Sequence, residues 1–519
     1  MATSYDAIVI GGGTNGLVTA TVLAKAGKRV VVLEANDAVG GGQRALEFAP
    51  GFRADPVAPD AGWISPAVAA ARGLRIDDLD LVWPEVSAPA PEGGMLTLSR
   101  DVAKTQEAIR RFSAKDAERW PAFTARVHRI AEFLGLLYGA PAPDVDTTSL
   151  GELFKLAGLG LKLRGLGKTE MIELLRNVPM AVDEFLDEWF ESDLLKALIG
   201  TGGVNNLQQG PRSGGTTFVL LHHHVGNPEG AIRTRPVPRA GMGLLTSRLL
   251  ELARGAGVEI RTGASVQSIL VRTDTATGVV LTSGEEVGGR AVISSADPFR
   301  TLLVLLDPVH LDPELIHAVR QIKFRGVAAK VLLALDGLPD GGSSLGGIVS
   351  VAPSLTYVEK ASDHAKYGRW SPEPWIEIRV PTVISPADAP AGKHAMVVHA
   401  QYAPYHLRDR DWSAERERFG DAVVATLERA IPGLAARIQS RTVLTPKDLE
   451  SRYGYTEGAI SQGELTLDQI LFMRPVAGWA RYQMPVPGLF LCGAGTHPGG
   501  GITGGSGLLA AREVLGRKA

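Results

Sequence analysis

Cysteine, excess charge and long apolar runs are all scarce in this 519-residue chain. Its one cysteine, Cys492, cannot form an intramolecular disulfide, which excludes enzymes that pass electrons through a cysteine pair. The formal net charge of −2 gives no reason to expect a nucleic-acid partner. No apolar run reaches the ~18 residues that a membrane span needs. We therefore expect a cytoplasmic protein, for which a peripheral membrane contact stays open.

The most informative pattern lies in the first forty residues. A short apolar run, a glycine-rich turn, a helical stretch, a second apolar run and an acid follow one another without a gap. They are Asp6–Ile10, Gly11–Gly16, Leu17–Ala26, Arg29–Leu33 and Glu34. Strand, glycine turn, helix, strand and acid in this order form the complete dinucleotide-binding fingerprint, so the sequence predicts a site for FAD or NAD.

Each position of the fingerprint has a physical role. Gly11 permits the tight turn, and Gly13 lets the backbone approach a pyrophosphate. Gly16 allows close packing of helix and strand, while the helix N-terminus offers unpaired N–H groups to the phosphates. Glu34 lies where a carboxylate accepts the hydroxyls of an adenosine ribose. The predicted site also includes the neighbours Thr14, Asn15 and Ala35.

A second glycine cluster follows the second predicted strand. Gly41 and Gly42 would let backbone lie beside a cofactor, and Arg44 could reach its phosphates. The alternative is a plain glycine turn with a solvated arginine. We include all three residues in the predicted cofactor site.

The middle of the chain is divided between a helical block and a return to α/β patterning. Helical spacing is expected at Val102–Phe112, Asp116–Leu137, Ser149–Leu161 and Thr169–Leu198. From Gly241 onward a helix, Leu244–Gly255, precedes short strand-like runs at Val258–Arg261, Ala264–Val271, Gly278–Leu281 and Ala291–Ser294. Further strands at Val327–Leu335, Trp375–Val380 and His394–Gln401, with a helix at Ala414–Ala430, predict a second sheet that carries a substrate pocket.

The carboxyl end favours FAD over NAD. A strand, Leu489–Cys492, opens through a glycine-rich loop into a final helix, Ser506–Leu515. The N-terminal end of that helix would stabilise negative charge on the pyrimidine edge of a reduced flavin. An enzyme that binds only NAD needs no second glycine-rich loop of this kind.

Taken together, the chain resembles the phytoene-desaturase-related flavoproteins within the amine-oxidase-like FAD enzymes. The branch it resembles most is that of the pyridine nucleotide-disulphide oxidoreductase domain-containing proteins. The motifs that carry the resemblance are Gly11–Leu17, Gly40-Gly41, Pro50-Gly51-Phe52, Gly241-Met242-Gly243, Phe472-Met473-Arg474-Pro475 and Pro487–Gly501, together with Asp187–Ser192 and Val219–His223 for the branch. They name no substrate and no oligomeric state.

The resemblance implies an α/β fold in which a Rossmann-type FAD-binding domain is interleaved with an α+β substrate domain. The FAD-binding domain would comprise residues 1–75, 240–300 and 480–519, and the substrate domain, with its helical insertion, residues 76–239 and 301–479. FAD would bind non-covalently, and its adenine would contact the backbone of Val266. Its isoalloxazine would lie along the C-terminal loop, at Gly495, Thr496, Gly501, Ile502 and Thr503. Gln43, Arg44 and Gln462 depart from the family pattern, as does Thr503 where carotenoid desaturases tend to have proline.

Candidate catalytic residues lie outside the cofactor motifs. Lys330 resembles the amine-oxidase lysine that bridges to the flavin through water; the alternative is an outward-facing lysine on a sheet edge. His222 and His223 are candidates for binding or base chemistry. We expect the run His222–His224 to lie on a strand, where neighbours point to opposite faces, so no metal site is predicted. Cys492 is interpreted as an inert core residue.

One segment bears on the membrane. Lys155–Lys168 is apolar and basic without an acid, so it could rest on an anionic membrane and admit a lipophilic substrate. The alternative, favoured by its glycines, is an exposed helix or loop.

These observations predict an FAD-dependent oxidoreductase that removes hydride from a C–C or C–N bond of a largely apolar small molecule. Electrons would pass to oxygen or a quinone-like acceptor. Two alternatives stay open: an FAD-dependent isomerase of a polyene-like substrate, and a non-catalytic scaffold stabilised by flavin.

Overall fold

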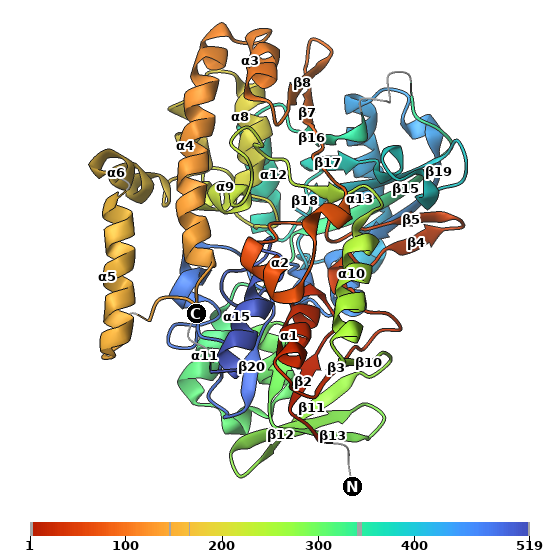
Figure 1. Ribbon diagram of the computed structural model, residues 1–519. Helices are drawn as coiled ribbons and strands as arrows, with labels where there is room; N and C mark the ends of the chain where they lie inside the picture. Colours follow the sequence, from red (N-terminus) through yellow and green to blue (C-terminus); the bar gives the residue numbers. More distant parts are fainter. Residues whose placement is uncertain (1–3, 145–146, 166, 340–344, 517–519) are drawn as a thin grey trace.

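The computed structural model describes residues 4–144, 147–165, 167–339 and 345–516 (Figure 1). A five-stranded parallel sheet lies in the lower half of the view, with order β10-β3-β2-β14-β20. Its strands are β2 (Ala7–Ile10), β3 (Val30–Leu33), β10 (Glu259–Arg261), β14 (Val292–Ser294) and β20 (Leu489–Leu491). The beginning, middle and end of the chain therefore meet in one sheet, as the sequence predicts.

Both faces of this sheet are covered, which explains why its strands are continuous apolar runs. Val9 and Val32 face the helices α1 (Thr14–Lys25), α10 (Met242–Gly255) and α15 (Gly505–Val514). Ile8 and Val31 face the other way, toward a smaller sheet of order β1-β13-β12-β11. The strands of that sheet are β1 (Ser4–Tyr5), β11 (Val266–Arg272), β12 (Thr275–Leu281) and β13 (Glu286–Gly289).

A seven-stranded sheet of order β19-β15-β18-β17-β16-β7-β8 forms the second body. Its strands are β7 (Val86–Pro89), β8 (Met95–Leu98), β15 (Ala328–Leu335), β16 (Ile348–Val351), β17 (Ile376–Arg379), β18 (His394–Gln401) and β19 (Ile438–Leu444). One face, including Val331 and Met396, packs on Trp412 and Phe419 of α13 (Trp412–Ala430). Because side chains alternate along a strand, Lys330, Glu377 and His399 lie on the opposite face, where they line a cavity.

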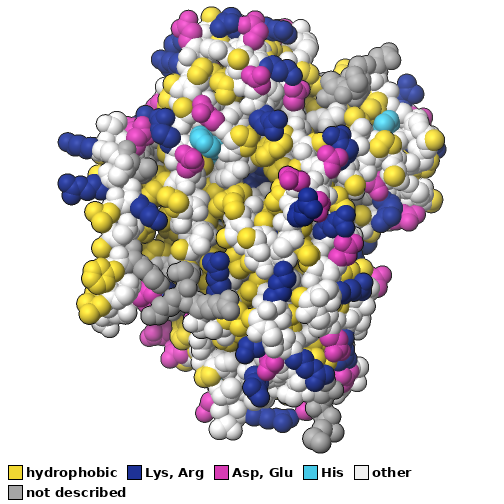
Figure 2. Space-filling view, viewed as in Figure 1, with side chains coloured by type: hydrophobic (Ala, Val, Ile, Leu, Met, Phe, Trp, Pro, Cys, Tyr) yellow, Lys and Arg dark blue, Asp and Glu magenta, His cyan; other side chains and the backbone are white. Residues whose placement is uncertain are grey.

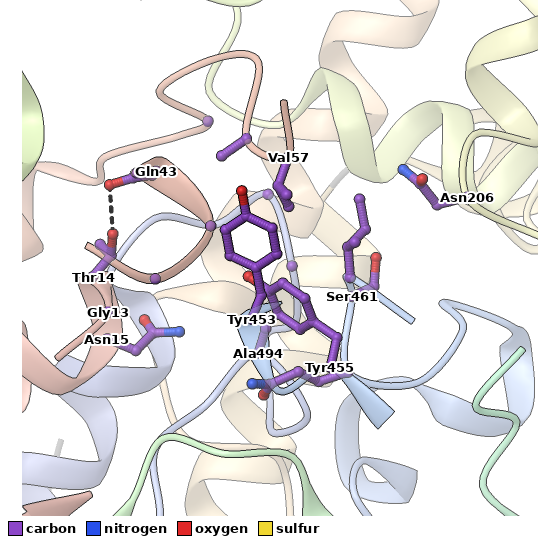
Figure 3. A pocket seen from close by; sticks show the side chains of 18 of the residues that line it. Gly13, Thr14, Asn15, Gln43, Val57, Asn206, Tyr453, Tyr455, Ser461 and Ala494 are labelled. Atoms are coloured by element: carbon purple, nitrogen blue, oxygen red, sulfur yellow. Dashed lines mark hydrogen bonds between the residues drawn. The ribbon is translucent and has the colours of Figure 1, made fainter. Parts of the chain in front are cut away.

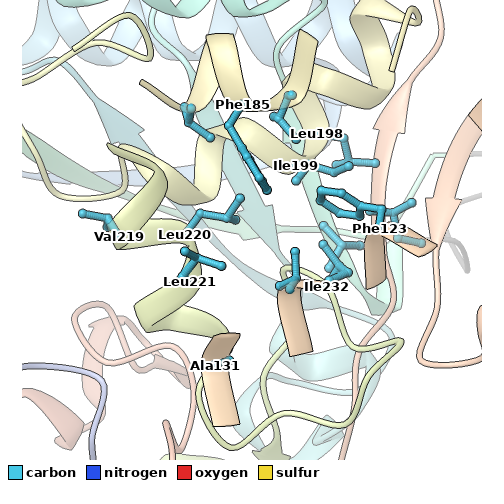
Figure 4. Close-up of a cluster of buried hydrophobic side chains, with 14 of the residues drawn as sticks. Phe123, Ala131, Phe185, Leu198, Ile199, Val219, Leu220, Leu221 and Ile232 are labelled. Carbon is cyan, nitrogen blue, oxygen red and sulfur yellow. The ribbon is translucent and has the colours of Figure 1, made fainter. Parts of the chain in front are cut away.

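Helices cover the upper left of Figure 1. They are α3 (Val102–Arg110), α4 (Ala114–Tyr138), α5 (Leu150–Gly165), α6 (Lys168–Asn177), α7 (Val182–Asp187), α8 (Asp193–Gly200) and α9 (Thr216–His224). Phe123, Phe185, Leu198 and Leu220, from four of these helices, point toward one another in the hydrophobic core of the block (Figure 4). Within the described residues, no helix is both long and apolar enough to cross a bilayer.

Two sequence-based expectations in this block are wrong. The single helix expected over Thr169–Leu198 is three helices, α6, α7 and α8, because the chain turns near Pro179 and again before the Ser192 N-cap. The strand expected at His222–His224 is the last turn of helix α9. The apolar run before it is buried on every side, so it shows no helical period to distinguish it from a buried strand.

The remaining elements connect these bodies. They are α2 (Pro66–Arg72), α11 (Pro313–Gln321), α12 (Leu355–Lys366), α14 (Pro446–Tyr453), β4 (Leu46–Ala49), β5 (Phe52–Ala54), β6 (Leu81–Val82) and β9 (Val237–Pro238). The domain boundaries proposed from the sequence stay a prediction.

Candidate active site

A cavity of about 750 Å³ extends from the glycine turn after β2 to the inner face of the seven-stranded sheet. At one end it is lined by Gly11, Gly13 and Glu34, and at the other by Lys330 and His399. Its volume lies in the usual range of ligand sites. A molecule bound in it would contact both sheets.

The glycine turn has the shape that the fingerprint requires. Gly11 has a φ of +90°, which side-chain-bearing residues rarely adopt. A Cβ on Gly16 would lie 2.1 Å from the Gly11 carbonyl oxygen, and one on Gly41 would lie 3.3 Å from the Cα of Gly13. Two backbone segments therefore approach each other here as only glycines allow.

Glu34 holds this turn together while it lines the cavity. Its Oε2 accepts the N–H of Gly12 at 2.8 Å, and its Oε1 accepts the backbone and side-chain N–H groups of Asn36 at 2.9 and 2.8 Å. The carboxylate is thus fixed in place at the cavity wall, beside Ala35 and Val266.

Other groups at this end fit a dinucleotide. The buried Oδ1 of Asn15 has no hydrogen-bond partner among the described residues, although Asn15 lines the cavity. Thr14 donates to Gln43 Oε1 at 2.7 Å. Figure 3 draws this pair together with Tyr453 and Tyr455, which also line the cavity. The unpartnered amide oxygen is suited to a hydroxyl or N–H donor of a ligand, and the helix N-terminus beside it is suited to an anionic group.

The cavity brings together twelve of the sixteen residues that the sequence predicts for the cofactor. They are Gly11, Gly13, Thr14, Asn15, Glu34, Ala35, Gly41, Gly42, Val266, Gly501, Ile502 and Thr503. Four others do not line it: Gly16, Arg44, Gly495 and Thr496.

Local contacts explain three of these four. Arg44 forms an ion pair with Asp37 at 2.7 Å, so its contact with a phosphate stays a prediction. Gly495 donates its N–H to Gln462 Oε1, and the Thr496 hydroxyl donates to the Gly493 carbonyl, both at 2.8 Å. These two residues shape the loop from behind, and Ala494 lines the cavity there instead.

Buried histidines fix the C-terminal loop. His222 accepts the hydroxyl of Tyr138 at 2.7 Å if its other ring nitrogen donates to the Gly500 carbonyl at 2.8 Å. Burial lowers the pKa of His222 to about 3, so the ring is neutral and suited to this double role. Within the loop itself, His497 Nε2 lies 3.2 and 3.1 Å from the carbonyl oxygens of Leu137 and Ala140. His222 therefore lies behind the wall, whereas His223 lines the cavity.

Lys330 belongs to a polar row on the inner face of the seven-stranded sheet. It lies on β15, between β18 and β19, so the alternative of an edge lysine is wrong. His399 is its direct neighbour on β18, and Glu377 on β17 is next in the row. Burial lowers the pKa of Lys330 to about 8.

The orientation of Lys330 follows from its neighbours. The Gln401 amide donates to the carbonyls of Val204 and Leu207, which leaves its Oε1 to accept from His399 Nε2 at 3.2 Å. His399 Nδ1 is then an acceptor, so Lys330 Nζ donates to it at 2.9 Å. Burial lowers the pKa of His399 to about 3, in agreement with a neutral ring.

Two arginines form hydrogen bonds with the polar row at Glu377. Glu377 accepts from Arg233 at 2.7 Å and from Arg379 at 3.4 Å. Although burial opposes its ionisation, the two guanidinium groups hold the pKa of Glu377 to about 2. Glu377, Arg379 and His399 are not among the residues predicted from the sequence; their one local signal is that charged or polar residues lie two apart in otherwise apolar strands.

Cys492 lies at the end of β20, buried, and does not line the cavity. Burial raises the pKa of its thiol to about 12, so a reactive thiolate is strongly disfavoured.

Comparisons with known proteins find relatives over almost the whole chain. The chain is 32% identical to pyridine nucleotide-disulfide oxidoreductase domain-containing protein 2 of Rattus norvegicus over 98% of this chain and 93% of that protein. It is 25% identical to a phytoene desaturase of Fusarium fujikuroi, over 95% and 86% of the two chains. An oxidoreductase structure from Methanosarcina mazei has the same fold, with a TM-score of 0.61 at 17% identity, covering 99% of this chain and 100% of that one.

The family model of the flavin containing amine oxidoreductases matches residues 16–515. This match and the fold together establish an oxidoreductase that uses a flavin. The chain belongs to the flavin containing amine oxidoreductase family.

Proposed function

We propose that this protein uses non-covalent FAD to take hydride from a C–C or C–N bond of a largely apolar small molecule. Electrons then pass to oxygen or a quinone-like acceptor. The observation that carries the proposal is one continuous cavity with a dinucleotide-fitting end at Glu34 and Asn15 and a buried amine, Lys330, at the other end. Flavin supplies the two-electron chemistry when bound.

Two features support the cofactor part of the proposal. The glycine turn and Glu34 suit the adenosine half of FAD, while the loop at Gly501–Thr503 and the start of α15 suit its flavin half. Cys492, the single cysteine, is buried outside the cavity, which favours non-covalent binding.

The protein's own residues would orient the substrate and move protons. His399 and Gln401 hold Lys330 Nζ at a fixed point of the cavity wall. A lysine whose pKa lies near 8 can both donate and accept a proton close to neutral pH. Lys330 could therefore order a water or take up the proton that leaves with the hydride.

Helices α5 and α6 support a contact with lipid. Six of the ten large, exposed hydrophobic side chains of the described residues lie on these two helices, at the left of Figure 2. They are Leu150, Leu153, Phe154, Leu161, Ile172 and Leu175. Lys162, Arg164 and Lys168 are exposed beside them, whereas Glu170 and Glu173 pair with Arg126 of α4. An anionic membrane surface fits this combination. Leu166 and the Lys155 side chain of the predicted basic segment lie outside what the structure describes.

The absorption spectrum of the purified protein tests the proposal. We expect a flavin spectrum, and free FAD in the supernatant after denaturation and precipitation. Yellow colour that stays with the pellet would show a covalent flavin. A colourless protein that cannot be loaded with FAD would refute the proposal.

Anaerobic mixing with candidate substrates then separates the functions. Bleaching of the flavin by a substrate supports net oxidation. Product formed by pre-reduced protein without any oxidant would indicate an isomerase, and a flavin that never bleaches would indicate a scaffold.

A further inference from the structure

The substrate end of the cavity contains more positive than negative groups. Four cationic side chains line it: Lys330, Arg233, Arg235 and Arg379. Two carboxylates lie among them, Asp60 and Glu377. The imidazoles of His223 and His399 add no charge, because burial lowers the pKa of each.

The two carboxylates are already engaged. Glu377 is shared by Arg233 and Arg379. Asp60 accepts the N–H of Gly62 at 3.0 Å and lies 4.0 Å from Arg379.

Lys330 and Arg235 have no carboxylate in hydrogen-bonding contact among the described residues. Lys330 donates to the neutral ring of His399. Arg235 donates to the carbonyl oxygens of His223 at 2.9 Å and Gly501 at 2.7 Å. Buried cations of this kind are costly unless an anion joins them.

Apolar side chains line the same region. Phe123, Val127, Leu220 and Ile232 line it, and each is buried. Figure 4 shows Phe123, Leu220 and Ile232 within one hydrophobic cluster. The cavity therefore offers apolar contacts for a hydrocarbon as well as cationic groups.

We infer that the substrate is a hydrophobic anion, with a hydrocarbon body against Phe123 and Leu220 and a carboxylate near Arg379 and Lys330. The inference rests on the proposed function and narrows its substrate class. A reduced, anionic flavin beside Gly501 would give the Arg235 guanidinium a negatively charged partner. Lys330 would still lack a carboxylate partner. An amine head group would add a further buried positive charge to this end, which disfavours cationic substrates.

Three ten-carbon probes test the inference on the FAD-loaded protein. Decanoate, decanol and decylamine each have a straight chain of ten carbons and differ mainly in the charge of the head group. Binding is followed by the change that each probe causes in the flavin absorption spectrum and in the thermal unfolding temperature. We expect decanoate to bind at least about tenfold more tightly than either other probe, as charge-assisted hydrogen bonds should provide.

The variant Arg379→Gln shows where the preference arises. We expect it to keep its flavin spectrum and to lose about tenfold in decanoate affinity, while decanol affinity changes little. Arg290→Gln, at an exposed arginine outside the cavity, serves as the matched control and should bind like the wild type.

The outcomes are separable. A flavin-loaded wild-type protein that binds decanol or decylamine as tightly as decanoate, or binds no decanoate, refutes the inference and leaves the proposed function intact. A protein that cannot be loaded with FAD refutes both. The comparison among the three probes needs only the wild type, so it stands even if Arg379→Gln fails to fold.

Discussion

At the scale of single residues, Glu34 combines two roles that one substitution disturbs together. Its carboxylate accepts hydrogen bonds from Gly12 and Asn36 and also lines the cavity. In Glu34→Gln one oxygen becomes an NH₂ group, which cannot accept these bonds and pairs poorly with ribose hydroxyls. We expect FAD affinity to fall by about 1.5–3 kcal/mol, or roughly 10- to 100-fold, as measured by fluorescence titration of the flavin-free protein.

The control for Glu34 is Glu286→Gln, at an exposed glutamate that pairs with Arg272 on the smaller sheet. This variant should bind FAD like the wild type. Unchanged affinity in Glu34→Gln would mean that Glu34 shapes the turn without contacting the cofactor.

Lys330 should make stability depend on pH. Its pKa is about 8 in the folded protein and 10.5 ordinarily, so between these values the unfolded chain binds more protons. The free energy of unfolding should therefore rise as the pH increases from 8 to 10.5, by up to about 3 kcal/mol. Urea unfolding of the flavin-free wild type and Lys330→Met at pH 8 and pH 10 measures the effect. The rise should be missing in the variant; an equal rise in both proteins would mean that other groups cause it.

The residues of the site differ in how far the sequence could reveal them. Gly11, Gly13 and Glu34 follow a local rule, because a turn between a strand and a helix fixes all three within one short segment. Lys330 was found as a charge in an apolar strand. Glu377 and His399 depend on which strands pair and in which register, and the sequence contains no local signal for that.

At the scale of elements, the segment 150–175 should decide whether the protein binds lipid. Phe154 is 76% exposed and Leu161 is 69% exposed, on a helix whose exposed charges include Lys162 and Arg164. We expect co-sedimentation with vesicles that contain phosphatidylglycerol, and much weaker binding to phosphatidylcholine alone. Replacing Phe154 and Leu161 by serine together should weaken binding at least tenfold, because each side chain contributes about 1.5–3 kcal/mol on burial.

The control for this prediction is Val309→Ser, at another large exposed hydrophobic residue (76% exposed). It should bind vesicles like the wild type. If the double serine variant also binds like the wild type, another part of the surface holds the lipid.

Helices and strands could be predicted where the sequence shows a hydrophobic period or a helix cap. The sequence placed β18 at its observed bounds, and α4 and α13 within two residues of theirs. Helix α9 was taken for a strand because Phe218–Leu221 is uniformly buried. Helices α6 to α8 were merged because their breaks depend on packing around Pro179 and on the Ser192 cap.

At the scale of the whole molecule, three distant segments of the chain supply β2, β14 and β20 to one sheet. The nucleotide-binding domain that the sequence assigns to these segments stays a prediction. Helix α1 packs on α15, and a Cβ on Gly507 would lie 2.3 Å from the Asn15 carbonyl oxygen. The first and last helices thus pack as closely as a glycine allows. The sequence alone does not reveal the excess of cationic side chains at the substrate end, because Asp60, Arg233 and residues 330–399 come together only in the folded chain.

Because the cavity is lined from both the five-stranded and the seven-stranded sheets, FAD should stabilise the molecule as a unit. At a free concentration about 1,000 times its Kd, a ligand that binds only the folded state adds about 4 kcal/mol to the free energy of unfolding. We expect removal of FAD to lower the thermal unfolding temperature and to speed tryptic cleavage within both 76–239 and 240–300. Glu34→Gln, measured at the same FAD concentration, should gain less. Faster cleavage in 240–300 alone would show that FAD binds one body without joining it to the other.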